Sequence, residues 1–378
     1  MKTVKRKACS ISGQEDLDNL YVFKSVPVFM GCVDSPVQDD LFQDMSWSIS
    51  NSSGAIQLDS LVPLEILYKE SHGSGDIGSL WENHHKCFAD FIFNFNPSSV
   101  FEIGGGHGRL SDIYKELQEI PWTIVEPNPT PQENNTANFI EGFFDSEFTD
   151  DGKYDTYVHS HVFEHLYNQD EFMRDLSNFT KPGDKLIFTL PNMEEMLKRK
   201  YTNCLNFEHT VFLTEPYIEY LLAKHGFRLI EKEYFMEDHS IFYASIRDLD
   251  QKPINISSEL YNQNKEAFFS YVQFHKKLIL DLNSKIRQFN GPVYLFGAHV
   301  FAQVLIQMGL DVSNIDCILD NDPNKQGKRL YGTSLMVNSP KILEGVNDAK
   351  VILKAGIYNA EIKKDILHNI NASTVFLE

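Results

Sequence analysis

A glycine-rich turn carries the residues whose types and spacing are best suited to chemistry. Glu102 opens it, and Gly104, Gly106 and Gly108 follow at every second position. Glycines let the backbone approach a ligand closely, and the helical pattern beyond them offers unpaired N–H groups at its start. Glu126 ends the next predicted strand, where an acid can bind two ribose hydroxyls. The segment predicts a nucleotide-like cofactor site. The alternative is an ordinary tight turn with an incidental glutamate.

The turn resembles the E/D-x-G-x-G-x-G pattern of class I S-adenosylmethionine methyltransferases and lacks the G-x-G-x-x-G spacing of dinucleotide-binding proteins. That resemblance implies S-adenosylmethionine as the cofactor, held by Glu102, the three glycines and Glu126. It also places Phe144 and Asp145 beside the adenine. For these two residues the alternative is structural, with core packing for the phenylalanine and a turn for the aspartate.

A histidine-rich segment at a predicted strand end contains His159, Ser160, His161, Glu164 and His165. Several imidazoles and a carboxylate so close together suggest a zinc site. The spacing shows neither a fourth ligand nor an acid to orient the others, so we predict no metal here. The commoner interpretation is the loop after the fourth strand of a methyltransferase core, where Ser160 and His161 line the methionine end of the cofactor.

Glu208 and His209 form an adjacent acid and imidazole in a loop after the strand end 190–192. Histidine titrates near neutrality and is the usual general base, and a neighbouring carboxylate can orient or polarise it. The pair is therefore predicted to act beside the methyl group of the cofactor. The alternative is a surface glutamate next to a capped histidine.

These motifs need a fold that brings strand ends together. Short apolar runs at 99–103, 122–126, 154–158 and 185–189 alternate with helical patterns. Such a β-α-β succession predicts an open, mostly parallel sheet covered by helices. Together with the resemblance of the glycine turn, which implies a class I methyltransferase core, this predicts an α/β protein with three parts: a small N-terminal lobe (1–62), a class I methyltransferase core with a Rossmann-like fold (63–250) and a second, C-terminal α/β domain, also Rossmann-like (251–378).

The composition excludes several classes of protein. The chain has 378 residues, with 34 Lys and Arg against 53 Asp and Glu and a net charge of −19, which argues against nucleic-acid and anionic-membrane partners. No window approaches 18 consecutive apolar residues, and the basic start is followed by no apolar run, so neither a membrane span nor a secretory signal is expected. Five dispersed cysteines indicate neither a disulfide framework nor a cysteine-only zinc site. We expect a soluble, cytoplasmic protein.

The whole chain resembles the three-part sugar C-methyltransferases of deoxysugar biosynthesis, which act on nucleotide-linked keto sugars. In the core the resemblance rests on the glycine turn, Tyr68 with the Ser-Gly segment after it, the helix from Trp81 to His84, His165 and the Glu208–His209 pair. In the C-terminal part it rests on 295–298 and, most specifically, on 320–327 followed by Gly332 and Thr333. The string N-K-Q-G followed by G-T is uncommon and is the better family marker.

This resemblance implies a reaction and its residues. His209 would remove the proton next to the ketone, with Glu208 as its neighbour. A carbon beside a carbonyl becomes nucleophilic once deprotonated and can then take a methyl group held in line. The partner would be a small molecule, a nucleotide-linked keto-deoxysugar or a related glycan precursor. The resemblance further lines the substrate pocket with His165, Tyr68, His72 and Asn206.

One departure from the family concerns zinc. The family's N-terminal lobe binds zinc through two cysteine pairs, whereas the matching segments here are C-S-I-S-G at 9–13 and S-N-S-S-G at 50–54. Three of the four ligands have become serine, which is a poor zinc ligand. No structural zinc is expected, and apolar contacts alone should hold the lobe, through residues such as Val28, Phe29 and Leu58.

The other departure is Asn206, where the family more often has a tyrosine before the Glu-His pair. An asparagine can donate a hydrogen bond but cannot act as an acid or base. This leaves open an O- or N-methyltransferase acting on a sugar or phosphosugar, and a non-catalytic relative that binds S-adenosylmethionine. In the C-terminal unit, Gly297 is the single glycine of a dinucleotide fingerprint, which disfavours a nicotinamide oxidoreductase. That unit is either scaffold or part of a nucleotide-sugar site.

Overall fold

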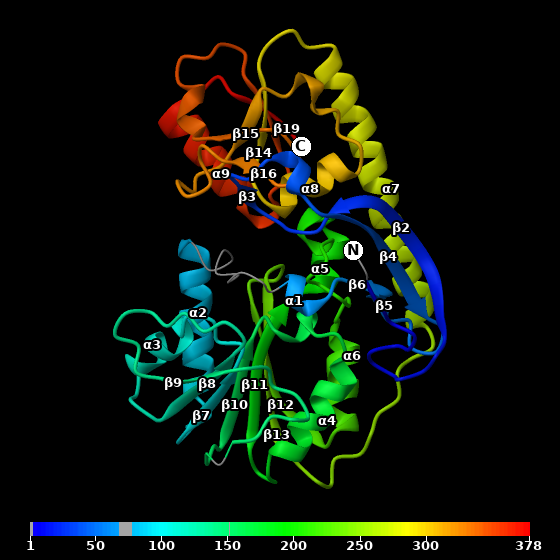
Figure 1. Ribbon diagram of the computed structural model, residues 1–378, viewed down its shortest axis with the longest axis vertical. Coiled ribbons are helices and arrows are strands. Elements are labelled where there is room, and N and C mark those ends of the chain that lie inside the picture. Colours follow the sequence, from blue (N-terminus) through cyan, green and yellow to red (C-terminus); the bar gives the residue numbers. More distant parts are fainter. Residues whose placement is uncertain (1–2, 68–77, 151) are drawn as a thin grey trace.

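The computed structural model describes residues 3–67, 78–150 and 152–378. Figure 1 shows two α/β bodies stacked along the long axis, with the N-terminal strands beside them. The long helix α7 (Leu260–Arg287) runs from the N-terminal strands to the C-terminal domain (Figure 1). Its buried face carries Phe268, Tyr271 and Val272, which pack in one cluster with Trp47 of the N-terminal strands.

The core domain is built on a seven-stranded sheet in the order β12-β13-β11-β10-β7-β8-β9. All neighbouring strands are parallel except β13, which runs antiparallel to β11 and to β12. This order, with one reversed strand near an edge, is that of the class I methyltransferase sheet and confirms the predicted fold class. The strands are β7 (Val100–Ile103), β8 (Trp122–Glu126), β9 (Asn138–Glu141), β10 (Thr156–Ser160), β11 (Lys185–Pro191), β12 (Phe227–Phe235) and β13 (Ser240–Arg247).

Helices cover both faces of this sheet because its central strands are buried on both sides. In β7, Val100 packs with α2 and α3 on one face, and Phe101 packs with α4 and α6 on the other. The segment from Trp81 to His84, expected to be helical, lies in α2, and α3 follows the glycine turn. The core helices are α1 (Leu64–Leu67), α2 (Ser79–Phe93), α3 (Arg109–Lys115), α4 (Gln169–Phe179), α5 (Met193–Lys198) and α6 (Glu215–Lys224).

The N-terminal segment forms small antiparallel sheets. One contains β2 (Leu17–Pro27), β4 (Phe42–Ser50) and β5 (Ile56–Leu58), and β1 (Val4–Lys5) pairs with β6 (Ser60–Leu61). Trp47 is fully buried and stacks on Phe212 of the core domain at 4.7 Å. The lobe therefore shares its apolar core with the methyltransferase domain.

The two turns that match the zinc-binding pairs of the family are closed by sulfur and hydroxyl hydrogen bonds. Ser12 N lies 3.5 Å from Cys9 Sγ, and Ser53 N donates to Ser50 Oγ at 3.2 Å. Cys9 Sγ and Ser53 Oγ, one from each turn, are 3.4 Å apart. Ser50 Oγ also donates to Asp16 Oδ1 at 2.9 Å. The prediction that apolar contacts alone hold the lobe is therefore wrong, because a buried polar network joins the turns.

The C-terminal domain is a five-stranded parallel sheet in the order β17-β15-β14-β18-β19. Its apolar strands pack against α8 and the inner face of α7 on one side. A second cluster, which includes Ile362 of α9, covers the other side. The elements are β14 (Val293–Phe296), α8 (Val300–Gln307), β15 (Cys317–Leu319), β16 (Arg329–Leu330), β17 (Val337–Asn338), β18 (Lys350–Leu353), α9 (Asn359–Asp365) and β19 (Val375–Leu377).

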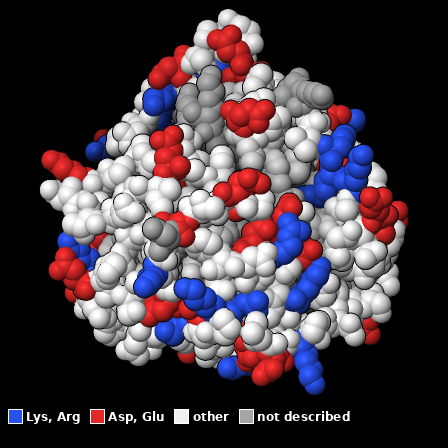
Figure 2. Space-filling view, turned by 60° about the horizontal axis from the view of Figure 1, so that its bottom comes forward, with Lys and Arg blue, Asp and Glu red and all other residues white. Residues whose placement is uncertain are grey.

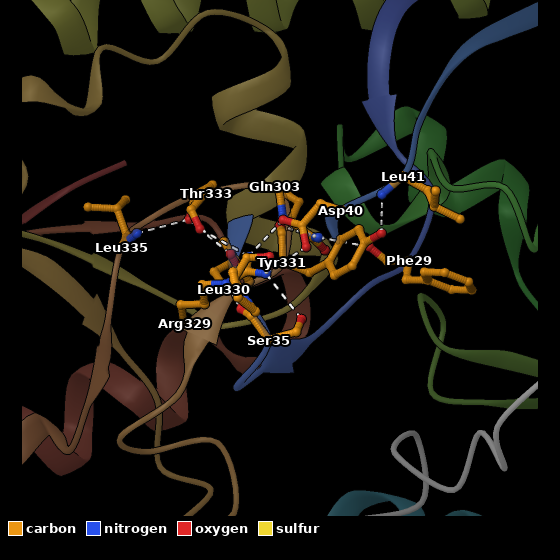
Figure 3. A network of polar contacts seen from close by, with 12 residues as sticks. Phe29, Ser35, Asp40, Leu41, Gln303, Arg329, Leu330, Tyr331, Thr333 and Leu335 are labelled. Atoms are coloured by element: carbon orange, nitrogen blue, oxygen red, sulfur yellow. Dashed lines mark hydrogen bonds and ion pairs between the residues drawn. The ribbon is translucent and has the colours of Figure 1, made fainter. Parts of the chain in front are cut away.

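The 320–327 string of the C-terminal domain lies just before the residues that hold the N-terminal segment against this domain. Strand β3 (Cys32–Val33) pairs with β16. Arg329 then binds Asp40 through two nitrogens at 2.6 and 2.7 Å, and its Nε donates to Ser35 O at 2.5 Å (Figure 3). Gly332 N donates to Asp40 Oδ2 at 2.8 Å. The division into the domains 1–62, 63–250 and 251–378 stays a prediction, because the N-terminal segment is shared between both bodies.

Figure 2 shows Asp and Glu side chains interspersed with Lys and Arg over the face at the core-domain end. In the part of the chain that the structure describes, no helix combines the length and the apolar character that crossing a membrane requires.

Candidate active site

The glycine turn leaves β7 and enters α3 through three left-handed glycines. The φ angle is +74° at Gly104, +53° at Gly106 and +80° at Gly108. A Cβ on Gly104 would lie 2.6 Å from Val162 Cγ2, and one on Gly108 would lie 2.5 Å from Asn135 Nδ2. A Cβ on Gly106 would meet nothing within 4 Å. The open side of the turn is therefore at Gly106, where a cofactor would have room.

Glu126 lies on this open side, as the sequence predicted for the acid after the second strand. Its Oε2 accepts a hydrogen bond from Gly106 N at 3.0 Å, and its Oε1 accepts one from Asn128 N at 3.3 Å. The carboxylate is partly exposed at the end of β8. A glycine turn with an adjacent, accessible carboxylate fits the ribose of S-adenosylmethionine. Glu126 would hold that group.

Replacement of Glu126 by alanine is expected to weaken S-adenosylhomocysteine binding by about 10- to 100-fold, because hydrogen bonds to a charged group contribute about 1.5–3 kcal/mol. Isothermal titration calorimetry measures the change. Glu119→Ala is the matched control, since the Glu119 side chain is 80% exposed. Equal dissociation constants for the two variants would show that Glu126 does not contact the cofactor.

Glu102, predicted as a cofactor ligand, lies beneath the turn. Its side chain is buried, and Oε2 accepts a hydrogen bond from Trp122 Nε1 at 2.7 Å. A Cβ on Gly105 would come within 2.8 Å of Glu102 Cδ. The carboxylate therefore supports the glycine turn from below, on the side away from the open position at Gly106.

Phe144 and Asp145 take the structural roles that the sequence left open. Asp145 is exposed, and its Oδ1 accepts a hydrogen bond from Glu147 N at 2.9 Å, as a turn acid does. Phe143, which the sequence analysis passed over, is the exposed aromatic residue of this segment at 50%. The ring of Phe144 packs at 5.5–6.1 Å from four core phenylalanines: Phe101, Phe148, Phe172 and Phe179.

The histidine-rich segment sends its imidazoles in different directions. His159 is fully buried in the core and stacks on Phe188 at 4.8 Å. Ser160 ends β10, half-buried. His161 has a φ of +52°, and its ring contacts Trp81 and His84 of α2 at 5.0 and 5.2 Å. The side chain of His161, predicted to face the cofactor, is thus directed toward α2.

Glu164, His165, Glu208 and His209 form a second polar group. Glu164 is fully buried, and its Oε1 lies 3.7 Å from His165 Nε2. His165 Nδ1 lies 3.9 Å from Glu208 Oε2, and the rings of His165 and His209 are 5.2 Å apart. Burial is the larger cause that lowers the pKa of His209, to about 4, and His161 also lowers it. The imidazole of His209 is therefore neutral at physiological pH, the form that accepts a proton.

Asn206, predicted as a substrate contact, shapes the loop instead. Its Oδ1 accepts hydrogen bonds from Glu208 N at 2.9 Å and from His209 N at 2.7 Å. Its Nδ2 donates to Asn203 O at 3.2 Å, and the residue is buried. An asparagine bonding to the backbone two and three residues on is a common turn device. Asn206 therefore positions the Glu-His pair.

A chain of contacts joins this loop to the cofactor turn. Thr210 N donates to Glu164 O at 3.0 Å, which ties the residue after His209 to the segment after β10. In that segment His165 N donates to Val162 O at 3.0 Å, and Val162 fills the space beside Gly104. The predicted base and the predicted cofactor turn thus lie on two sides of one short segment. Tyr68 and His72, also predicted to contact the substrate, lie outside the described residues.

Sequence reasoning missed Trp81 and its neighbours as a group. Trp81 lies at the start of α2, and its ring contacts His84, His161 and His239 at 5.0–5.2 Å. Burial raises the pKa of Tyr358 in the C-terminal domain, and a hydrogen bond from Trp81 opposes the shift. Trp81 therefore links the core domain to the C-terminal domain. The W-x-x-H-H string at 81–85 was the only signal in the sequence.

The turn of the C-terminal domain that imitates a nucleotide-binding half makes its contacts with the protein itself. Ala298 N donates to Asp320 Oδ2 at 2.8 Å, where a dinucleotide site would keep its acid for a ribose. Cys32 Sγ of the N-terminal segment donates to Ala298 O at 3.3 Å, so β3 lies against this turn. Lys325 Nζ also binds Asp320, at 3.4 Å. These contacts favour the scaffold interpretation of this turn.

Two family models match the chain. A methyltransferase domain matches residues 79–232, and a C-methyltransferase C-terminal domain matches residues 257–376. A comparison with curated proteins found no match. The matched ranges fall on the seven-stranded core and on the five-stranded C-terminal unit.

Similar solved structures include three methyltransferases. An O-methyltransferase family protein from Burkholderia thailandensis is 12% identical, with a TM-score of 0.37, over 45% of this chain and 57% of that one. The 1,6-didemethyltoxoflavin-N1-methyltransferase of the same organism is 14% identical, with a TM-score of 0.39, over 53% and 96%. Human N-acetylserotonin methyltransferase is 16% identical, with a TM-score of 0.37, over 50% and 60%. The chain spans less than two thirds of the first and third of these proteins.

The matched domains and the strand order define the class of protein. The chain is an S-adenosylmethionine-dependent methyltransferase with a class I core. Its pairing of a methyltransferase domain with a C-methyltransferase C-terminal domain supports a place in a C-methyltransferase family.

Proposed function

We propose that this enzyme methylates a carbon next to the keto group of a nucleotide-linked deoxysugar, with His209 as the general base. S-adenosylmethionine would supply an electrophilic methyl group at the glycine turn. The protein must remove a proton from the carbon that accepts the methyl group, and it must hold the resulting enolate. The match to a C-methyltransferase C-terminal domain favours carbon over oxygen or nitrogen as the acceptor.

The observation that carries this proposal is the position and state of His209. Its imidazole is neutral because burial lowers its pKa, and its Nδ1 has no hydrogen-bond partner. The backbone N–H groups of Glu208 and His209 are fixed by Asn206, so the loop is ordered before substrate arrives. A positioned, neutral imidazole beside the segment that supports the cofactor turn is what proton abstraction requires.

The role of Glu208 follows from its contacts. Its carboxylate lies 3.9 Å from His165 Nδ1, and its side chain is only 16% exposed. A carboxylate close to the imidazoles would stabilise the imidazolium that forms when His209 takes a proton. His165, 5.2 Å from His209 between ring centroids, would then donate a hydrogen bond to the enolate oxygen.

Deuterium exchange tests the proposal without methyl transfer. The probe is a nucleoside-diphosphate 4-keto-6-deoxyhexose, incubated with the enzyme and S-adenosylhomocysteine in D₂O. We expect the carbon next to the ketone to gain deuterium faster than in buffer alone, as followed by mass spectrometry. Methyl transfer to this sugar without enzyme-dependent exchange would favour the O- or N-methyltransferase alternative. Neither exchange nor transfer, in protein that binds S-adenosylhomocysteine, would contradict the substrate class.

A further inference from the structure

Three histidines from distant parts of the chain meet beside the active site. His84 belongs to α2, His161 follows β10, and His239 precedes β13. One ring nitrogen of each histidine lies within 4.8 Å of those of the other two. The ring centroid of His84 lies 5.2 Å from that of His161 and 5.4 Å from that of His239.

The trihistidine cluster is mostly buried, and burial keeps the imidazoles of His84 and His239 neutral. His84 is 0% exposed and His239 is 5% exposed, and the Trp81 ring covers all three. Burial, reinforced by the neighbouring histidines, lowers the pKa of His84 well below its usual value. Burial also lowers the pKa of His239, to about 3. Neutral imidazole is the form that ligates metal ions.

Glu164 provides the carboxylate that metal-bound histidines usually have behind them. Its Oε1 lies 3.2 Å from His161 Nδ1, and Nε2 of the same ring lies 3.0 Å from Ser240 Oγ. Histidine ligands almost always pass their other N–H to a carboxylate, a carbonyl or water. His161 also holds a left-handed backbone, with φ at +52°, which directs its ring toward His84.

A hydroxyl network explains only part of the cluster. Ser240 Oγ lies 3.0 Å from His161 Nε2 and 2.6 Å from His239 Nδ1, so it can donate to one ring and accept from the other, and His84 Nε2 lies 3.4 Å from Thr189 Oγ1. His84 Nδ1 is buried without a hydrogen-bond partner. A buried polar atom without a partner calls for an explanation such as an ion.

We propose that His84, His161 and His239 bind one divalent transition-metal ion, such as zinc, with a coordination position left open for an oxygen atom. Three protein ligands and an open position are the pattern of catalytic zinc sites, and imidazole nitrogen favours zinc, iron, copper or nickel over magnesium or calcium. Glu164 lies between this site and His165. If the proposed function holds, the oxygen ligand is the substrate keto oxygen, whose charge the ion stabilises during proton removal. The metal site itself does not depend on that function.

Cobalt binding tests the site without any substrate. The tag-free full-length protein is dialysed against a chelator and titrated with CoCl₂ while visible absorption is recorded. We expect intense four- or five-coordinate Co²⁺ bands that saturate at one equivalent and disappear when zinc is added. The bands should be lost in His84→Ala and His239→Ala, and Glu164→Gln should weaken binding by about 10- to 100-fold. His368→Ala, which changes an exposed histidine of the C-terminal domain, should bind cobalt like the native protein.

Three results would overturn the proposal. The first is the absence of a saturable cobalt spectrum. The second is unchanged cobalt affinity in His84→Ala and His239→Ala. The third is loss of binding in His209→Ala but not in His84→Ala, which would place the ion on Glu164, His165 and His209. Calorimetry with S-adenosylhomocysteine confirms that each variant is folded. X-ray absorption of the native cobalt protein gives an independent count of the imidazole ligands. A count below three would also overturn the proposed site.

Discussion

Replacement of His209 by glutamine is expected to lower the rate of methyl transfer by about 10²- to 10⁴-fold, the usual contribution of a positioned general base. Glutamine fills much of the space of the imidazole but cannot take a proton at neutral pH. The loop should keep its shape, because Asn206 Oδ1 bonds to the backbone of residue 209 and not to its side chain. Transfer of a labelled methyl group to the keto sugar measures the rate.

The binding of S-adenosylhomocysteine separates lost chemistry from lost structure. His209 contacts His165, and Val162 lies between that segment and the glycine turn, so His209→Gln should leave this affinity unchanged. His368→Gln is the matched control, since it makes the same change at an exposed position. A His209→Gln enzyme that retained the native rate would remove His209 as the base. The O- and N-methyl alternatives would then need another base as well.

The pH dependence of the native enzyme gives a second readout of the same residue. Because burial lowers the pKa of His209 to about 4, the base is deprotonated at every pH above about 5. We therefore expect kcat/KM to show no decline near pH 6.5, the ordinary value for histidine, and to fall only toward pH 4. An acid limb at pH 6.5, with circular dichroism showing intact protein, would mean that His209 is solvated in the free enzyme.

Local motifs predicted that the glycine turn and Glu126 lie together, because the geometry of such motifs is set by neighbouring residues. That these residues bind the cofactor stays a prediction. The left-handed glycines follow β7, and Glu126 ends β8. The parallel pairing of these two strands brings their ends together. Glu102 shows the limit of this reasoning. The alternation of side chains along β7 puts Glu102 on the face of Val100 and Trp122, inside the domain, and spacing alone did not reveal that face.

Residues that meet only in three dimensions were beyond the sequence. The histidine segment was first considered as a metal site in itself, whereas the structure separates His159 from His161 and brings His161 next to His84 of α2 and His239 just before β13. Asn206 was assigned to the substrate because of its place in the family motif. Its hydrogen bonds show that a polar side chain beside the proposed catalytic pair can bond entirely to the backbone. The ring of Phe144 likewise packs against the core phenylalanines.

The free energy of unfolding is expected to fall steeply as the pH drops from about 6.5 toward 4. Burial lowers the pKa of His159 and His239 to about 3 and that of His275 to about 4. Above pH 6.5 neither the folded nor the unfolded chain protonates these rings, so they add no pH dependence. Below it the unfolded chain gains protons that the folded chain does not bind, and each ring lowers stability by about 1.4 kcal/mol per pH unit.

These three rings alone amount to about 4 kcal/mol per pH unit, and burial also lowers the pKa of His209 and His299 to about 4. A domain is stable by only about 5–15 kcal/mol, so acid unfolding should begin well above the pKa of the carboxylates. The buried Glu164 acts in the opposite direction, since burial raises its pKa and the folded chain takes up that proton first. Proton uptake by this one carboxyl group offsets only part of the stability that the three histidines remove. Urea unfolding, followed by tryptophan fluorescence at a series of pH values, measures the slope.

His159 allows a single ring to be tested. Both of its nitrogens are buried without hydrogen-bond partners, and phenylalanine rings from β11, α4 and the segment after β10 surround it. His159→Phe keeps an aromatic ring and removes the titration, so the slope between pH 6 and 4 should fall by about 1.4 kcal/mol per pH unit. Any packing cost of the larger ring shifts stability equally at all pH values and leaves this slope unaffected. His368→Phe, at an exposed position, should keep the native slope. A native slope in His159→Phe would mean that the ring at position 159 is already charged in the folded protein, and that the core around Phe188 admits water.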